Sequence, residues 1–84
     1  MDQAEIRQTA REVLALVLGV ELNELENREV SRSTLAAWDS LKHIDVVFSL
    51  EERFGVMFAE EEMPELNSLD NICSIVESRI NGSS

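Results

Sequence analysis

The fold of this chain is decided by its most regular amphipathic stretch, residues 39–55, which read DSLKHIDVVFSLEERFG. Apolar residues recur there at spacings of three and four, the period of one helix face. We therefore predict a helix from about Ser40 to Arg53, capped by Asp39 and ended by Gly55. Its inward face is expected to hold Leu41, Ile44, Val47, Phe48, Leu50 and Phe54.

Two other segments show the same period. The first covers residues 3–18, with Gly19 as a natural stop, and the second is a last helix capped by Ser68 with a stripe from Leu69 to Ile80. Between the helix at 40–53 and this last helix, Glu60–Met63 can form one helical turn before Pro64. Proline disfavours helical geometry at the residue that precedes it. We predict an all-α fold, a small bundle of three main helices plus one short helix around a single core.

Residues 20–38 form a long loop between the first two main helices. Their apolar residues are scattered without a period, and such loops are usually functional or held by their own apolar side chains. Trp38 is expected to anchor this loop on the bundle, although an exposed contact with a partner would also fit. The chain reads as one domain, residues 1–84, in which 81–84 look like a frayed tail.

The composition limits the class of function. The apolar fraction is 44% and the net charge −10, of which −8 lies between Ser33 and Ser78. This charge disfavours binding to nucleic acid and anionic membranes, and it attracts basic protein partners. The alternative is that the charge only keeps a small domain soluble. The single cysteine, Cys73, excludes an internal disulfide. The sequence shows no signal peptide and no apolar run of membrane-spanning length, so a soluble, cytoplasmic monomer is expected.

Ser40 is the candidate functional residue, because it lies where an acidic loop meets a helix start and offers an accessible hydroxyl. The alternative is that Ser40 is only a helix cap. His43 lies three residues further, where it could donate to a phosphate on Ser40, touch a partner, or simply face solvent. No metal site is expected, and a Ser–His–Asp triad on one exposed helix face would lack a pocket and an oxyanion hole.

With these residues in place, the chain resembles an acyl carrier protein over almost its whole length. The resemblance rests on the spacing of four features: Asp39-Ser40-Leu41, the helix ending at Gly55, the acidic turn Glu60–Glu62, and Ser68-Leu69 opening the last helix. It implies a non-catalytic protein that carries 4′-phosphopantetheine on Ser40. A separate phosphopantetheinyl transferase would attach this group, whose thiol would hold acyl intermediates as thioesters.

The resemblance also implies roles for neighbouring residues. Asp39 matches the acid that precedes the modified serine, and Leu41, Ile44 and Met63 match apolar positions that flank the arm. Asp45, Glu51 and Glu52 match the acidic helix face that binds partner enzymes, namely a loading ligase and downstream transferases or synthases. Tethering and charge-driven encounters suit such serial delivery.

The motif departs from that of fatty-acid carriers at two places. Ala37-Trp38 stands where a glycine is usual before the acid, and Lys42 stands where an acid is usual. The Trp-Asp-Ser-Leu-x-His form resembles stand-alone carriers of specialised pathways such as polyketide assembly, with Lys42 as a partner-selecting residue. Two alternatives stay open: a peptidyl or aminoacyl carrier, and an unmodified acidic helical adaptor.

Overall fold

The computed structural model describes residues 2–26 and 28–81. The tail expected at 81–84 lies outside the described residues, except for the backbone of Asn81, which closes the last helix. Over the described residues the fold is all-helical and has the predicted three main helices. They are α1 (Gln3–Leu18), α2 (Ser40–Phe54) and α3 (Leu69–Asn81), joined by two short 3-10 helices, η1 (Leu22–Leu25) and η2 (Glu60–Glu65). Only η2 was predicted.

The helix ends follow the sequence signals. The carboxylate of Asp2 accepts from the Glu5 backbone N–H at 2.8 Å, and Asp39 accepts from that of Lys42 at 2.9 Å. Both satisfy first-turn donors that have no partner inside the helix. At the other ends, Gly19 and Gly55 adopt φ values of 70° and 67°, a left-handed conformation that residues with a Cβ rarely adopt.

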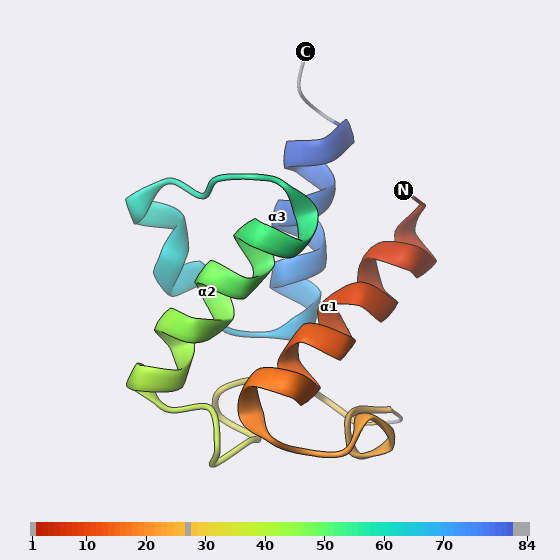
Figure 1. Cartoon of the computed structure of the whole chain (residues 1–84), viewed down its shortest axis with the longest axis vertical. Coiled ribbons are helices and arrows are strands. Elements are labelled where there is room, and N and C mark those ends of the chain that lie inside the picture. The colour runs from red at the N-terminus through yellow and green to blue at the C-terminus, as the bar shows by residue number, and fades with distance from the viewer. Residues whose placement is uncertain (1, 27, 82–84) are drawn as a thin grey trace.

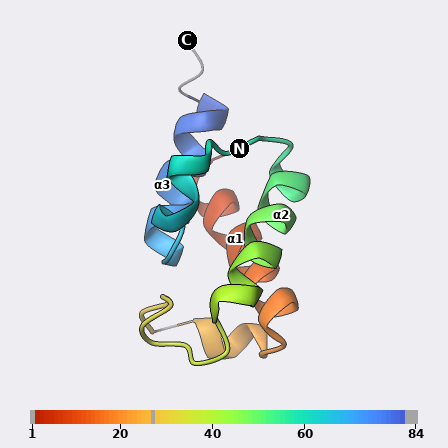
Figure 2. The same ribbon diagram turned by 90° about the vertical axis from the view of Figure 1, so that its left-hand side faces the viewer.

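The three α-helices surround one core, with α1 in contact with both α2 and α3. In Figure 1, α1 runs in the opposite direction to α2 and α3, and the long loop crosses the end of the bundle where α2 begins. Figure 2 shows the same loop below the three helices. The start of α2 is therefore exposed at one end of the molecule, next to the loop.

The predicted inward face of α2 is partly wrong. Val47 and Leu50 are buried as expected, but the other buried residues are His43 and Val46. Leu41, Ile44 and Phe48 are instead 77%, 53% and 58% exposed. The helix carries two apolar stripes, so its periodicity alone allowed either rotation. The buried choice includes His43, and both ring nitrogens of His43 have partners that compensate for its burial.

The long loop is held in the core as predicted. Leu25, Val30 and Leu35 are buried, and Trp38 is only 2% exposed, which confirms it as the loop anchor. Backbone bonds also tie the loop to the start of α3. Arg32 N–H donates to the carbonyl of Asn67 at 2.9 Å, and Leu69 N–H donates to that of Val30, also at 2.9 Å.

The short helix extends further than predicted. It continues through Pro64 to Glu65, because Leu66 N–H donates to the carbonyl of Met63 and carries the turn past the proline. Its start is fixed by Glu62, whose carboxylate accepts from Ala59 N–H at 2.8 Å. That hydrogen bond is the main cause that lowers the pKa of Glu62, and the ion pair with Arg79 adds to the effect.

Candidate functional site

Ser40 is the first residue of α2, and its side chain is exposed. The chain reaches this position extended, with Asp39 at φ −93° and ψ −174°, and turns into the helix there. The hydroxyl therefore lies at the positive end of the α2 dipole, where the first backbone N–H groups have no intrahelical acceptor. Asp39 is exposed beside it, with its carboxylate bound to the Lys42 backbone N–H.

Arg32 also belongs to this site, although it was not predicted from the sequence. Its terminal nitrogen Nη2 lies 3.3 Å from the Ser40 hydroxyl oxygen, and its Nε lies 3.5 Å from the Trp38 carbonyl oxygen. Arg32 comes eight residues before Ser40 in an irregular stretch, so no period or motif relates the two residues. The turns between Ser31 and Trp38 fold the loop so that Arg32 reaches the start of α2, and its backbone bond to Asn67 holds it there.

His43 is not placed as the sequence suggested. The side chain is 9% exposed, and its ring lies between two partners on different segments. Nδ1 accepts from the indole Nε1–H of Trp38 at 3.0 Å, and Nε2 lies 2.7 Å from the carbonyl oxygen of Met63. With both nitrogens engaged, His43 neither faces solvent nor turns toward Ser40. It joins the loop, α2 and η2.

The apolar residues named near Ser40 occupy two different positions. Leu41 and Ile44 lie on the outer face of α2 and, together with Phe48, form an exposed stripe at spacings of three and four. Met63 is half-buried on η2, and it meets α2 through its backbone bond to His43. Leu41 and Ile44 thus lie near Ser40 on the outer face of α2, whereas Met63 contacts the helix on its buried side, at His43.

The charged residues expected to meet partners are mostly exposed. Lys42, Asp45 and Glu52 all face solvent on α2. Glu51 differs, because it is half-buried and its carboxylate accepts from Phe58 N–H at 2.9 Å. Glu51 therefore fixes the link after α2, which sequence periodicity could not indicate.

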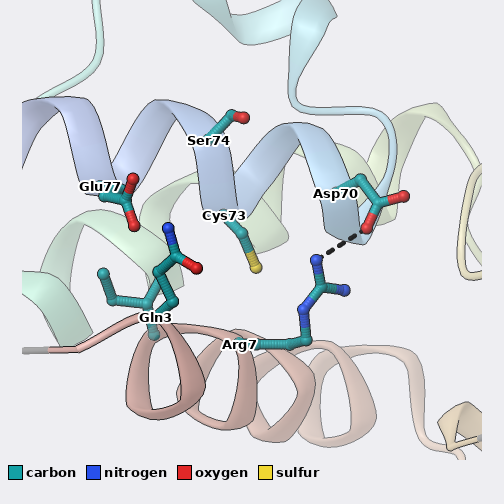
Figure 3. Close-up of a pocket in the computed structure, with 7 residues that line it drawn as sticks. Gln3, Arg7, Asp70, Cys73, Ser74 and Glu77 are labelled. Carbon is teal, nitrogen blue, oxygen red and sulfur yellow. Dashed lines mark hydrogen bonds and ion pairs between the residues drawn. The ribbon is translucent and has the colours of Figure 1, made fainter.

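Away from Ser40, a cleft lies between α1 and α3 (Figure 3). It has a volume of about 230 Å³ and contains the sulfur of Cys73, beside the ion pair of Arg7 with Asp70 at 2.8 Å. Burial raises the pKa of the Cys73 thiol above its ordinary value, which disfavours the reactive thiolate. This cleft thus offers no activated nucleophile.

The chemistry available at Ser40 is that of an accessible hydroxyl that contacts the guanidinium of Arg32, a hydrogen-bond donor and not a base. The ring of His43 is occupied elsewhere, and the neighbouring carboxylate of Asp39 is bound to the backbone. Across residues 2–26 and 28–81, no three His, Cys, Asp or Glu side chains are grouped to hold a metal ion. No helix in that part of the chain is long and apolar enough to cross a membrane.

The fold and the site together describe a small helical bundle with an exposed serine hydroxyl at the N-terminus of its second main helix. No family model matches the sequence. Among curated proteins, it is 33% identical to the acyl carrier protein of Rubrobacter xylanophilus, over 90% of this chain and 93% of that protein. It is 26% identical to the acyl carrier protein of Thermosynechococcus vestitus, over 95% of this chain and 98% of that protein. The chain belongs to the acyl carrier protein family.

Proposed function

We propose that this protein carries 4′-phosphopantetheine on Ser40 and delivers acyl groups to partner enzymes without catalysing a reaction itself. When bound, that group supplies a flexible arm whose terminal thiol holds an acyl group as a thioester. The observation that carries the proposal is the exposed Ser40 hydroxyl at the start of α2, in a chain whose relatives are named acyl carrier proteins.

The residues around Ser40 fit a permanently charged phosphodiester. The hydroxyl lies at a helix N-terminus, where unpaired N–H groups and the dipole favour an anion. The guanidinium of Arg32, 3.3 Å away, adds a full positive charge. Asp39 caps the first turn of α2 through its bond to Lys42 N–H. This bond fixes the position of the Ser40 backbone, from which the side chain points into solvent. These features support attachment there by a phosphopantetheinyl transferase using coenzyme A.

The outer face of α2 fits the docking of partner enzymes. Asp45 and Glu52 supply exposed negative charge, and Leu41 and Ile44 supply exposed apolar surface close to the arm. Exposed charges give rapid, salt-sensitive encounters, and these suit a carrier that visits several enzymes in turn. The partners we propose are a loading ligase and downstream transferases or synthases, met by a monomeric carrier in the cytoplasm.

Lys42 is proposed to select among those partners. It is exposed on α2, between the modified serine and Asp45, and it reverses the charge usual for fatty-acid carriers at this place. A specialised pathway, such as polyketide assembly, is therefore favoured over fatty-acid synthesis. Lys42→Glu should change the order in which a panel of partner enzymes accepts the loaded carrier. An unchanged order would refute this role.

Intact-mass spectrometry tests the central proposal. Incubation with coenzyme A and a broad-specificity transferase should add the mass of one 4′-phosphopantetheine group to the wild type. Ser40→Ala should abolish the gain, while Ser74→Ala, which removes another exposed helical serine, should retain it. No gain in the wild type, or a gain that survives Ser40→Ala, would favour the unmodified adaptor instead.

The nature of the cargo is a separate question. A peptidyl or aminoacyl carrier would use the same arm and differ only in what is loaded, and the name of both relatives, acyl carrier protein, favours acyl cargo. Loading assays with acyl and aminoacyl donors on the modified protein distinguish these two readings. A fluorophosphonate probe should leave Ser40 unlabelled, since its hydroxyl contacts the Arg32 guanidinium, which is a donor, and no imidazole.

A further inference from the structure

We propose that Arg32 binds the phosphodiester attached to Ser40 and so fixes the base of the arm against the start of α2. This inference rests on the proposed function and assigns a positioning residue to it. The residue lies in the long loop, outside the motif that surrounds the serine. Its side chain already contacts the hydroxyl oxygen that would form the ester bond, at 3.3 Å from Nη2.

The position of Arg32 is fixed at three points along the residue. Its backbone N–H donates to the Asn67 carbonyl at 2.9 Å, its Nε lies 3.5 Å from the Trp38 carbonyl oxygen, and its Nη2 reaches Ser40. The side chain is half-buried along this path. Because it is held before any anion is attached, binding a phosphate oxygen there costs little further side-chain entropy.

The donor count also suits a phosphate. A guanidinium carries five N–H donors in a planar fork, and the contacts with Trp38 and Ser40 use two of them. The remaining donors can reach oxygens on a phosphorus bonded to the Ser40 oxygen. Lysine at this place would offer a point charge without that fork.

The local charges make such a cation useful. Attachment adds a negative charge to a chain of net charge −10, next to the exposed carboxylate of Asp39. Like charges on neighbouring residues repel each other, and the guanidinium of Arg32 at the Ser40 oxygen offsets that repulsion. Arg32 would therefore stabilise the modified protein more than the unmodified one.

The difference in melting temperature between modified and unmodified protein measures this effect. We expect modification to raise the wild-type Tm, and Arg32→Gln to reduce that gain by about 2–4 °C, the size expected for one exposed charge-assisted contact in a domain of this length. Arg28→Gln is the matched control: Arg28 is exposed in the same loop and donates to the Thr34 carbonyl instead. It should leave the gain intact.

A purely structural role for Arg32 would lower both melting temperatures equally and leave their difference unchanged. That result would overturn the inference even if mass spectrometry showed full modification of every variant. A wild type that gains no mass would overturn the proposed function, and this inference with it. The two failures are therefore distinguishable.

Nuclear magnetic resonance of the wild type gives a second readout that needs no variant to fold. The Nε–H resonance of Arg32 should shift when the protein is converted from the unmodified to the modified form, while that of Arg28 stays in place. Arg32→Lys should restore part of the Tm gain, because it keeps the charge but not the fork. An unmoved Arg32 resonance would refute the contact.

Discussion

Trp38→Phe should destabilise the fold through a chain of hydrogen bonds that crosses three segments. The indole nitrogen of Trp38 can only donate, so Nδ1 of His43 accepts its bond at 3.0 Å. The imidazole proton then resides on Nε2, which donates to the Met63 carbonyl at 2.7 Å. Phenylalanine keeps most of the packing of Trp38 but removes the donor, leaving Nδ1 without its partner inside the protein.

The expected loss has two parts. Leaving the buried Nδ1 unpaired costs about 1–3 kcal/mol. Trp38 is only 2% exposed, so removing one ring also leaves a partly collapsed cavity that costs about 1–2 kcal/mol. The sum of about 2–5 kcal/mol is a large share of the total stability of a domain of 84 residues, about 4–12 kcal/mol.

Urea unfolding followed by far-ultraviolet circular dichroism measures this loss, since the variant has no tryptophan fluorescence. A double-mutant cycle with His43→Leu isolates the bond between the two side chains. We expect Trp38→Phe to cost about 1–2 kcal/mol less in the His43→Leu background, because the acceptor is then already gone. Ile44→Ala serves as control, since that neighbour on α2 is exposed and should change stability by less than about 0.5 kcal/mol.

Two outcomes would contradict this reasoning. The first is a cost below about 1 kcal/mol for Trp38→Phe, which would mean that the indole donor and the buried ring contribute little. The second is additivity within about 0.5 kcal/mol, the level expected of independent sites, which would mean that Trp38 and His43 are not coupled.

Three other predictions test the burial and charges described above. Leu41→Ala should leave the free energy of unfolding within about 0.5 kcal/mol of wild type, whereas Leu50→Ala should cost about 2–5 kcal/mol; equal losses would restore the helix rotation expected from sequence. Cys73 should react with iodoacetamide more slowly than a free cysteine at neutral pH, because burial raises its pKa, and denaturation should remove the difference; equal rates in the folded state would count against burial. The folded-state pKa of Glu62 is lowered, so its stabilising effect is complete above its ordinary value of 4.5 and is lost as the pH falls through the lower folded value. Urea midpoints should therefore fall more steeply on acidification in wild type than in Glu62→Gln, and parallel curves would refute the contribution of the carboxylate.

Local signals were enough to predict the three main helices. Asp2 and Asp39 cap helices with their carboxylates, and Gly19 and Gly55 end them in the left-handed conformation. These effects act within a few residues, so the order of the chain reveals them. The serine at the start of α2 was found in the same way, because a residue just after a cap is exposed with its hydroxyl near the helix end.

The rotation of α2 could not be read from the chain, because the helix offers two apolar stripes and the choice between them depends on distant partners. His43 is buried since the loop supplies Trp38 and η2 supplies the Met63 carbonyl, and neither contact follows from the spacing of α2 itself.

The sequence by itself determined where the three main helices begin and end, which serine stands at the start of α2, and how acidic the chain is, because caps, periods and charges are local properties. Only the tertiary structure decided which face of α2 is buried and which cation stands beside Ser40. Arg32 reaches that hydroxyl because the loop turns back on itself between Ser31 and Trp38 while it pairs with the segment before α3, and this path of the loop depends on how the whole bundle packs.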